Sequence, residues 1–79
     1  MAPKVMPMKP NGIAIKEFRE SRHIGSRELA RRASISHQFL VRIQQGRRGA
    51  SQETIEAIAE ALGVSIASIT LPEPVGSPR

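Results

Sequence analysis

The side chains best suited to specific chemistry lie close together in residues 36–42. Gln38 carries an amide and Arg42 a guanidinium, and each can form two parallel hydrogen bonds with a flat polar partner. His37 can donate or accept a hydrogen bond, and Val41 offers an apolar contact. No spacing in the chain is typical of a catalytic triad, paired carboxylates or a phosphate-cradling glycine loop, so we expect no enzyme.

The apolar residues around this polar set predict two short helices joined by a tight turn. Those residues are Leu29, Ala30, Ala33, Leu40 and Ile43, with Ile35 in the connection. Such a pair is a helix-turn-helix, whose second helix lies in the major groove of DNA. There Gln38 can pair with adenine N6 and N7, Arg42 with guanine O6 and N7, and Val41 can meet a thymine methyl group.

The rest of the chain predicts further helices and no strand, because no segment alternates in hydropathy for long enough. We expect a first helix over residues 12–22 capped by Asn11, with Lys16 and Glu20 paired across one turn. The second expected helix runs to about residue 33, with Gly25 or Ser26 as its cap. The third is capped by Ser36 and ended by Gly46, and the fourth is capped by Ser51, runs to about residue 62 and is closed by Gly63. A short turn over residues 65–69 follows.

Three regions are expected along the chain. Residues 1–10, with three prolines and two lysines, predict a flexible basic arm. Residues 11–70 form the helical domain, and residues 71–79 predict a disordered tail because they are rich in proline. One interpretation is that the arm, with Lys4 and Lys9, wraps the DNA duplex or reaches a minor groove. The other is that the arm has no role, and both interpretations stay open.

The charge is unevenly distributed over a chain of 79 residues with a net charge of +5. Residues 22–48 contain seven arginines and the single acid Glu28, whereas residues 49–78 contain four glutamates and no lysine or arginine. A cationic surface of this kind favours a polyanionic partner, and the plain alternative is a solvated basic surface.

The composition excludes several classes of site. The chain has no cysteine, so disulfides and thiolate metal sites are absent. His23 and His37 have no third ligand nearby in the sequence, so we expect no metal and no cofactor. No apolar run approaches the roughly 18 residues of a membrane span, and the N-terminus is not typical of a secretory signal. We therefore expect a cytoplasmic protein with no membrane contact and no small-molecule ligand.

The chain resembles the phage repressor and Cro family of regulators, often called XRE-type, over about residues 11–70. The matching residues are Arg19, Glu28-Leu29-Ala30, Ile35-Ser36, Ile43, Gly46 and Ala61-Leu62-Gly63-Val64-Ser65. The resemblance implies an all-α, compact bundle of four to five short helices, a lambda repressor-like DNA-binding domain. It also implies binding to double-stranded operator DNA, usually as a homodimer on a two-fold symmetric site.

The resemblance also implies contact residues. The base contacts are expected at His37, Gln38, Val41 and Arg42, although a protonated His37 would favour phosphate instead. The phosphate contacts are expected at Ser26, Arg27, Ser36, Arg47 and Arg48.

The chain departs from the family at two positions. Many members pair the first-helix arginine with a glutamate, but here Arg19 would meet Gln44, whose neutral amide can accept a hydrogen bond from the guanidinium but cannot form an ion pair. Phe39 stands where many members have a small or polar residue; it either packs on the core beside Ile43 or faces outward toward the DNA backbone or a partner subunit.

These observations predict a sequence-specific transcriptional regulator of a bacterium or phage, located with the nucleoid, that represses or activates by occupying DNA. If it dimerises, Ile66, Ile69 and Leu71 are the expected apolar surface; a monomer and a dimer formed only on DNA stay equally open. The alternative function is a protein-binding helix-turn-helix module, such as an antitoxin or anti-repressor partner, that uses residues 50–71.

Overall fold

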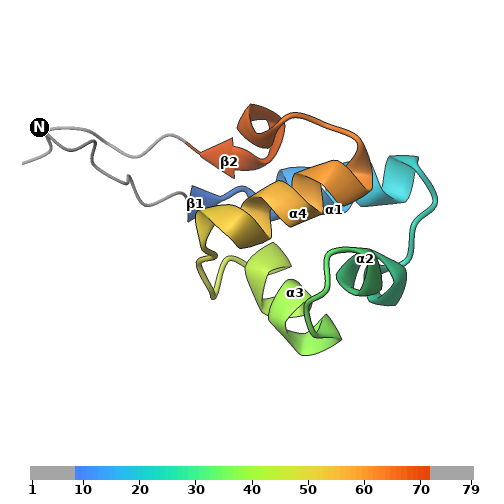
Figure 1. Cartoon of the computed structure of the whole chain (residues 1–79), viewed down its shortest axis with the longest axis horizontal. Helices are drawn as coiled ribbons and strands as arrows, with labels where there is room; N and C mark the ends of the chain where they lie inside the picture. Colours follow the sequence, from blue (N-terminus) through green and yellow to red (C-terminus); the bar gives the residue numbers. More distant parts are fainter. Residues whose placement is uncertain (1–8, 72–79) are drawn as a thin grey trace, which may run out of the picture.

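The computed structural model describes residues 9–71, and the expectations for residues 1–8 and 72–79 lie outside them. Within the described part, four α-helices surround one core and a short ribbon joins its two ends (Figure 1). The elements in chain order are β1 (Lys9–Pro10), α1 (Gly12–Ser21), α2 (Ser26–Arg32), α3 (His37–Gln44), α4 (Gln52–Leu62), the 3₁₀ turn η1 (Ile66–Ile69) and β2 (Thr70–Leu71). The all-α helical class is confirmed.

Three of the helices begin at the predicted capping residues. The side-chain oxygens of Asn11, Ser36 and Ser51 each accept a hydrogen bond from the backbone N–H three residues further on, at 3.1, 3.0 and 3.2 Å. Of the two residues predicted as possible caps of α2, Gly25 takes the cap position and Ser26 is the first helical residue. The hydroxyl of Ser26 is thereby available for another partner.

The helices end through left-handed residues. Gly63 closes α4 with φ +75° and Gly46 follows α3 with φ +76°, both in a conformation that costs glycine little. Two residues with a Cβ adopt the same region: His23 after α1 with φ +57°, and Ser34 in the turn between α2 and α3 with φ +61°. Their backbone is strained, because an L side chain crowds the following carbonyl there.

The core is entirely apolar among the described residues and draws on α1, α2, α3, α4 and η1. Its members are Ile15, Leu29, Ala30, Ala33, Leu40, Ile43, Ile55, Ile58, Ala59, Leu62 and Ile69. Leu40 and Ile43 are fully buried, as the helical stripe predicts. The opposite side of α3 is therefore turned toward solvent.

A two-stranded antiparallel ribbon was not predicted, so the expectation of no strand is wrong. Lys9 pairs with Leu71 and Pro10 with Thr70, and next to them the Asn11 N–H donates to the Ile69 carbonyl at 2.8 Å. Strands of two residues are too short to show alternation in the sequence. The ribbon includes residues that we assigned to the arm and to the tail.

Two further expectations are wrong in the described part of the chain. Lys16 and Glu20 form no ion pair; Glu20 lies instead 4.0 Å from the Arg19 guanidinium. Ile69 cannot belong to an exposed apolar surface because η1 places it in the core at 0% exposure, and Ile66 is half-buried; of that expected trio only Leu71 is exposed.

The N-terminus of α1 lies directly against the C-terminus of α3. A Cβ at Gly12 would lie 2.4 Å from the carbonyl oxygen of Gln44 and 2.6 Å from that of Ile43. Both distances are shorter than van der Waals contact, and the obstacles are backbone atoms that cannot rotate away. Glycine is therefore required for this approach, which fixes the end of α3 relative to α1.

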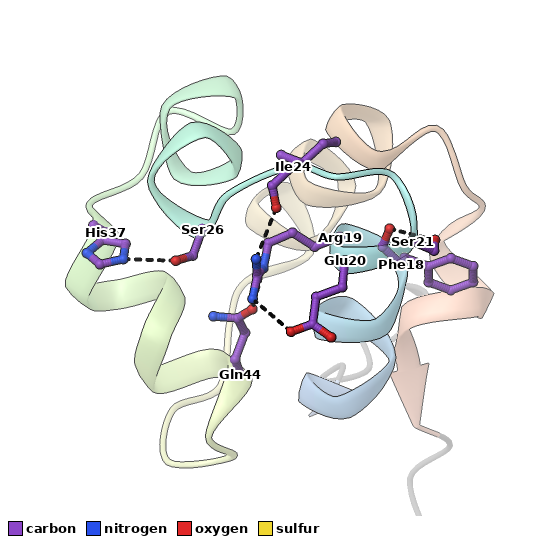
Figure 2. A network of polar contacts seen from close by, with 8 residues as sticks. All are labelled: Phe18, Arg19, Glu20, Ser21, Ile24, Ser26, His37 and Gln44. Carbon is purple, nitrogen blue, oxygen red and sulfur yellow. Dashed lines mark hydrogen bonds and ion pairs between the residues drawn. The ribbon is translucent and has the colours of Figure 1, made fainter.

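Arg19 reinforces the same junction with a half-buried polar network (Figure 2). Its Nε donates to the Gln44 side-chain oxygen at 3.0 Å, and its Nη1 donates to the Ile24 carbonyl at 3.0 Å. The Arg19 side chain is only 14% exposed. The expected replacement of an ion pair by a hydrogen bond is confirmed, and α1, α3 and the loop before α2 are joined by one guanidinium.

We expect Gly12→Ala to lower the free energy of unfolding by about 1–3 kcal/mol, because the added methyl group overpacks a rigid contact. Chemical denaturation monitored by circular dichroism measures this. Gly49→Ala is the matched control, since a Cβ there meets no atom within 4 Å and the backbone is not left-handed. Equal stability of the two variants would contradict the close approach.

We expect Ser34→Gly to raise the free energy of unfolding by about 0.5–1 kcal/mol, because relief of the left-handed strain exceeds the extra chain entropy of glycine. Thermal melting measures the change. Ser34→Ala keeps the strain and should give no gain. If alanine stabilised as much as glycine, the backbone at this turn would not be the cause.

We expect Gln44→Glu to be neutral or to stabilise by up to about 1.5 kcal/mol, because hydrogen bonds between charged partners are stronger than neutral ones. The gain should disappear at acid pH as the new carboxylate is protonated, since the stability it adds requires the charged form. Melting temperatures across pH test this. Gln44→Leu, which leaves the Arg19 Nε without its acceptor, should melt lower; a clear fall for Gln44→Glu would refute the pairing.

Candidate nucleic-acid interface

The solvent side of α3 presents the predicted reading residues. Gln38 and Arg42 are exposed and one turn apart, while His37 and Val41 are half-buried beside them. An eight-residue helix is too short to be stable alone, so packing on the core must hold this face in place. The structure thus brings all four predicted base-contact residues to one side of one helix.

A hollow of about 280 Å³ lies along this face. It is lined by Ser36, Gln38, Phe39 and Arg42 of the α3 region and by Arg48 of the following loop. The Arg48 guanidinium lies over the Phe39 ring, 5.1 Å from its centre. Phe39 packs against the core, as the first of its two expectations states, and its ring also carries the Arg48 cation; the expected contact with DNA or a partner subunit stays a prediction.

His37 has a partner within the fold. Its Nε2 lies 3.1 Å from the Ser26 hydroxyl, so the first residues of α2 and α3 are hydrogen-bonded to each other (Figure 2). No local pattern predicts this contact, because Ser26 and His37 lie on different helices, 11 residues apart in the sequence. With Nε2 engaged, only Nδ1 of His37 is open to an outside group.

The arginines of α2 differ in their surroundings. Glu28 accepts hydrogen bonds from Arg31 and, at 2.8 Å, from Arg32. The hydrogen bonds from Arg32 and then Arg31 lower the pKa of Glu28 below its ordinary value. Arg31 and Arg32 thus share the single counter-charge of Glu28 on the helix itself, whereas Arg27 is exposed and forms no ion pair within residues 9–71.

The loop after α3 carries the exposed Arg47 and Arg48. A second hollow, of about 160 Å³, lies between residues 46–49 and the β1 residues Lys9 and Pro10. No local signal places Lys9 here, because the contact joins segments that are more than thirty residues apart in the sequence.

Other kinds of site are not found in the part that the structure describes. Within residues 9–71 no three His, Asp or Glu side chains are grouped so that they could hold a metal ion. In the same residues, no helix has the length and apolar character to cross a membrane.

Comparison with known sequences identifies relatives. The family profile described as Helix-turn-helix matches residues 15–69. The immunity repressor protein of Bacillus phage phi105 is 36% identical over 58 residues, which are 73% of this chain and 40% of the repressor. An uncharacterized HTH-type transcriptional regulator of Mycobacterium tuberculosis is 37% identical over 54 residues, which are 68% of this chain and 39% of the regulator. The chain spans about two fifths of the length of these relatives.

Solved structures share the fold. The clp gene regulator ClgR from Corynebacterium glutamicum superposes with a TM-score of 0.69 and 34% identity, covering 71% of this chain and 60% of ClgR. The biofilm master regulator SinR, solved in complex with DNA, gives a TM-score of 0.68 and 26% identity, covering 71% of this chain and 90% of SinR. The family profile covers well over half of the sequence. The chain therefore belongs to the repressor and Cro (XRE-type) helix-turn-helix family.

Proposed function

We propose that this chain is a sequence-specific DNA-binding transcriptional regulator whose α3 enters the major groove. One observation carries the proposal: α3 buries Leu40 and Ile43 completely and exposes Gln38 and Arg42 on its other side. A helix fixed in this way presents hydrogen-bonding side chains in one set direction, as groove reading requires.

The exposed face supplies the readout. Gln38 would bond to adenine N6 and N7, Arg42 to guanine O6 and N7, and Val41 would contact a thymine methyl group. Each good bidentate pair discriminates against the wrong base by about 1–3 kcal/mol. His37 would use Nδ1 for a base or phosphate, while its Nε2 holds the Ser26 hydroxyl in place.

The flanking residues would fix the protein on the DNA backbone. Ser26 and Arg27 begin α2 on one side of the reading face, and Arg47 and Arg48 follow α3 on the other. Ser36 lines the first hollow together with Arg48. Phosphate contacts from both sides would set the register without reading sequence.

The relatives support this function. One is named as a phage immunity repressor, and the structure of SinR was solved with DNA. A regulator of this kind would act on DNA in the cytoplasmic nucleoid by occupancy, either blocking polymerase or touching it. Two copies on a two-fold symmetric operator would fit the family pattern; the described surface offers Ile13 and Leu71 as its exposed large apolar residues.

Selection of bound duplexes from a random pool tests the proposal directly. We expect a defined site that binds about 10³-fold or more tightly than random DNA. A symmetric site would show that two copies bind. Failure to select any sequence, with only weak salt-sensitive binding, would reject the regulator and favour the protein-binding alternative, an antitoxin or anti-repressor partner.

Variants then separate the two kinds of contact. Gln38→Ala and Arg42→Ala should relax the preference at one base pair each, whereas Arg47→Ala should weaken binding to all sequences alike. Gln45→Ala is the matched control for Gln38, because Gln45 is an exposed glutamine at the opposite end of α3 and outside its hollow. Unchanged base preference in both Gln38→Ala and Arg42→Ala would show that α3 does not read the groove.

A further inference from the structure

The second hollow gathers positive charge from two distant segments. Among residues 9–71, its lining includes the cations Lys9, Arg47 and Arg48 and no acidic side chain. Within residues 9–71 none of the three forms an ion pair with a carboxylate. On α2, by contrast, Glu28 accepts hydrogen bonds from both Arg31 and Arg32. Like charges gathered without a counter-charge favour an outside anion.

The backbone fixes Lys9 at this place. Lys9 pairs with Leu71 in the ribbon, and the next residue, Pro10, is buried. Gly12 then lies against the last carbonyls of α3, close to where the loop carrying Arg47 begins. Figure 1 shows β1 at the same end of the molecule as the loop between α3 and α4. The position of Lys9 is therefore set by the same contacts that set the end of α3.

The two hollows are neighbours that share one lining residue, Arg48. One leads from Arg48 to the reading residues Gln38 and Arg42, and the other leads from Arg48 to Lys9. A DNA strand whose bases meet α3 would thus run its backbone past Arg48 toward Lys9. The anion best suited to this second hollow is a phosphate of the bound duplex.

We propose that Lys9 is a DNA phosphate contact that forms one site with Arg47 and Arg48, built into the folded domain. This inference rests on the proposed DNA-binding function and deepens it. In this interpretation Lys9 is held by the ribbon and is not part of a flexible arm. The predicted contact is independent of base sequence, because it is made to the DNA backbone.

The test measures affinity of the full chain for its selected site and for a random duplex over a range of salt concentrations. Lys9→Gln should weaken both complexes and flatten the slope of log K against log salt by about 0.9. The ratio of wild-type to variant affinity should therefore fall about threefold as the salt concentration rises from about 50 to about 200 mM. Lys9→Arg should keep the wild-type slope, and Lys9→Gln should keep the wild-type melting temperature because Lys9 is exposed.

Lys16→Gln is the charge-matched control, since Lys16 is an exposed lysine of α1 that lines neither hollow. It should leave the slope unchanged; if it flattened the slope as much as Lys9→Gln, net charge alone would be responsible and the site would be refuted. An unchanged slope in Lys9→Gln, with specific binding retained, would overturn the Lys9 assignment alone. If the wild-type chain bound its selected site no more tightly than a random duplex, the proposed function itself would be overturned.

Double variants test whether the cations share one site. The losses of DNA-binding free energy caused by Lys9→Gln and by Arg47→Ala should be non-additive, because both residues line the same hollow. Lys9→Gln combined with Arg27→Ala should be additive, because Arg27 lies on α2 and does not line that hollow. Additive losses in both pairs would contradict a shared site.

Discussion

The anchoring of α3 is the constraint on which the rest of the structure depends. With eight residues, this helix gains little stability from its own hydrogen bonds. Burial of Leu40 and Ile43 contributes roughly 2 kcal/mol each and fixes which side faces solvent. At its C-terminal end, the Gly12 backbone and the Arg19 guanidinium hold it against α1. The exposed face is therefore a rigid surface whose direction is determined by contacts on the hidden side.

The polar contacts of the arginines divide them into two groups. Arg19, Arg31 and Arg32 are engaged within the fold, by Gln44 or by Glu28, and contribute to the structure of their helices. The exposed arginines at the reading face and in the loop after it have no carboxylate partner within residues 9–71. Arg48 is held by an aromatic ring, which orients a cation without neutralising it. Positive charge is thus kept available where an anionic duplex would lie.

The beginnings of α2 and α3 are joined by their side chains. Nε2 of His37 lies 3.1 Å from the Ser26 hydroxyl, so the first residue of α3 is hydrogen-bonded to the first residue of α2. The turn between them includes Ser34 in a left-handed conformation. Because this strain is maintained by packing on both sides, the angle between the two helices is set by the core and by the turn together.

The sequence by itself determined the helices, their caps and the polar face of α3, because capping, glycine at helix ends and the 3.6-residue period act between near neighbours. Only the tertiary structure decided which distant segments of the chain lie next to each other. The ribbon of β1 with β2, the burial of Ile69 and the approach of Lys9 to the loop after α3 all belong to this group. These contacts join residues that lie roughly 40 to 60 positions apart in the chain, and no local spacing encodes them.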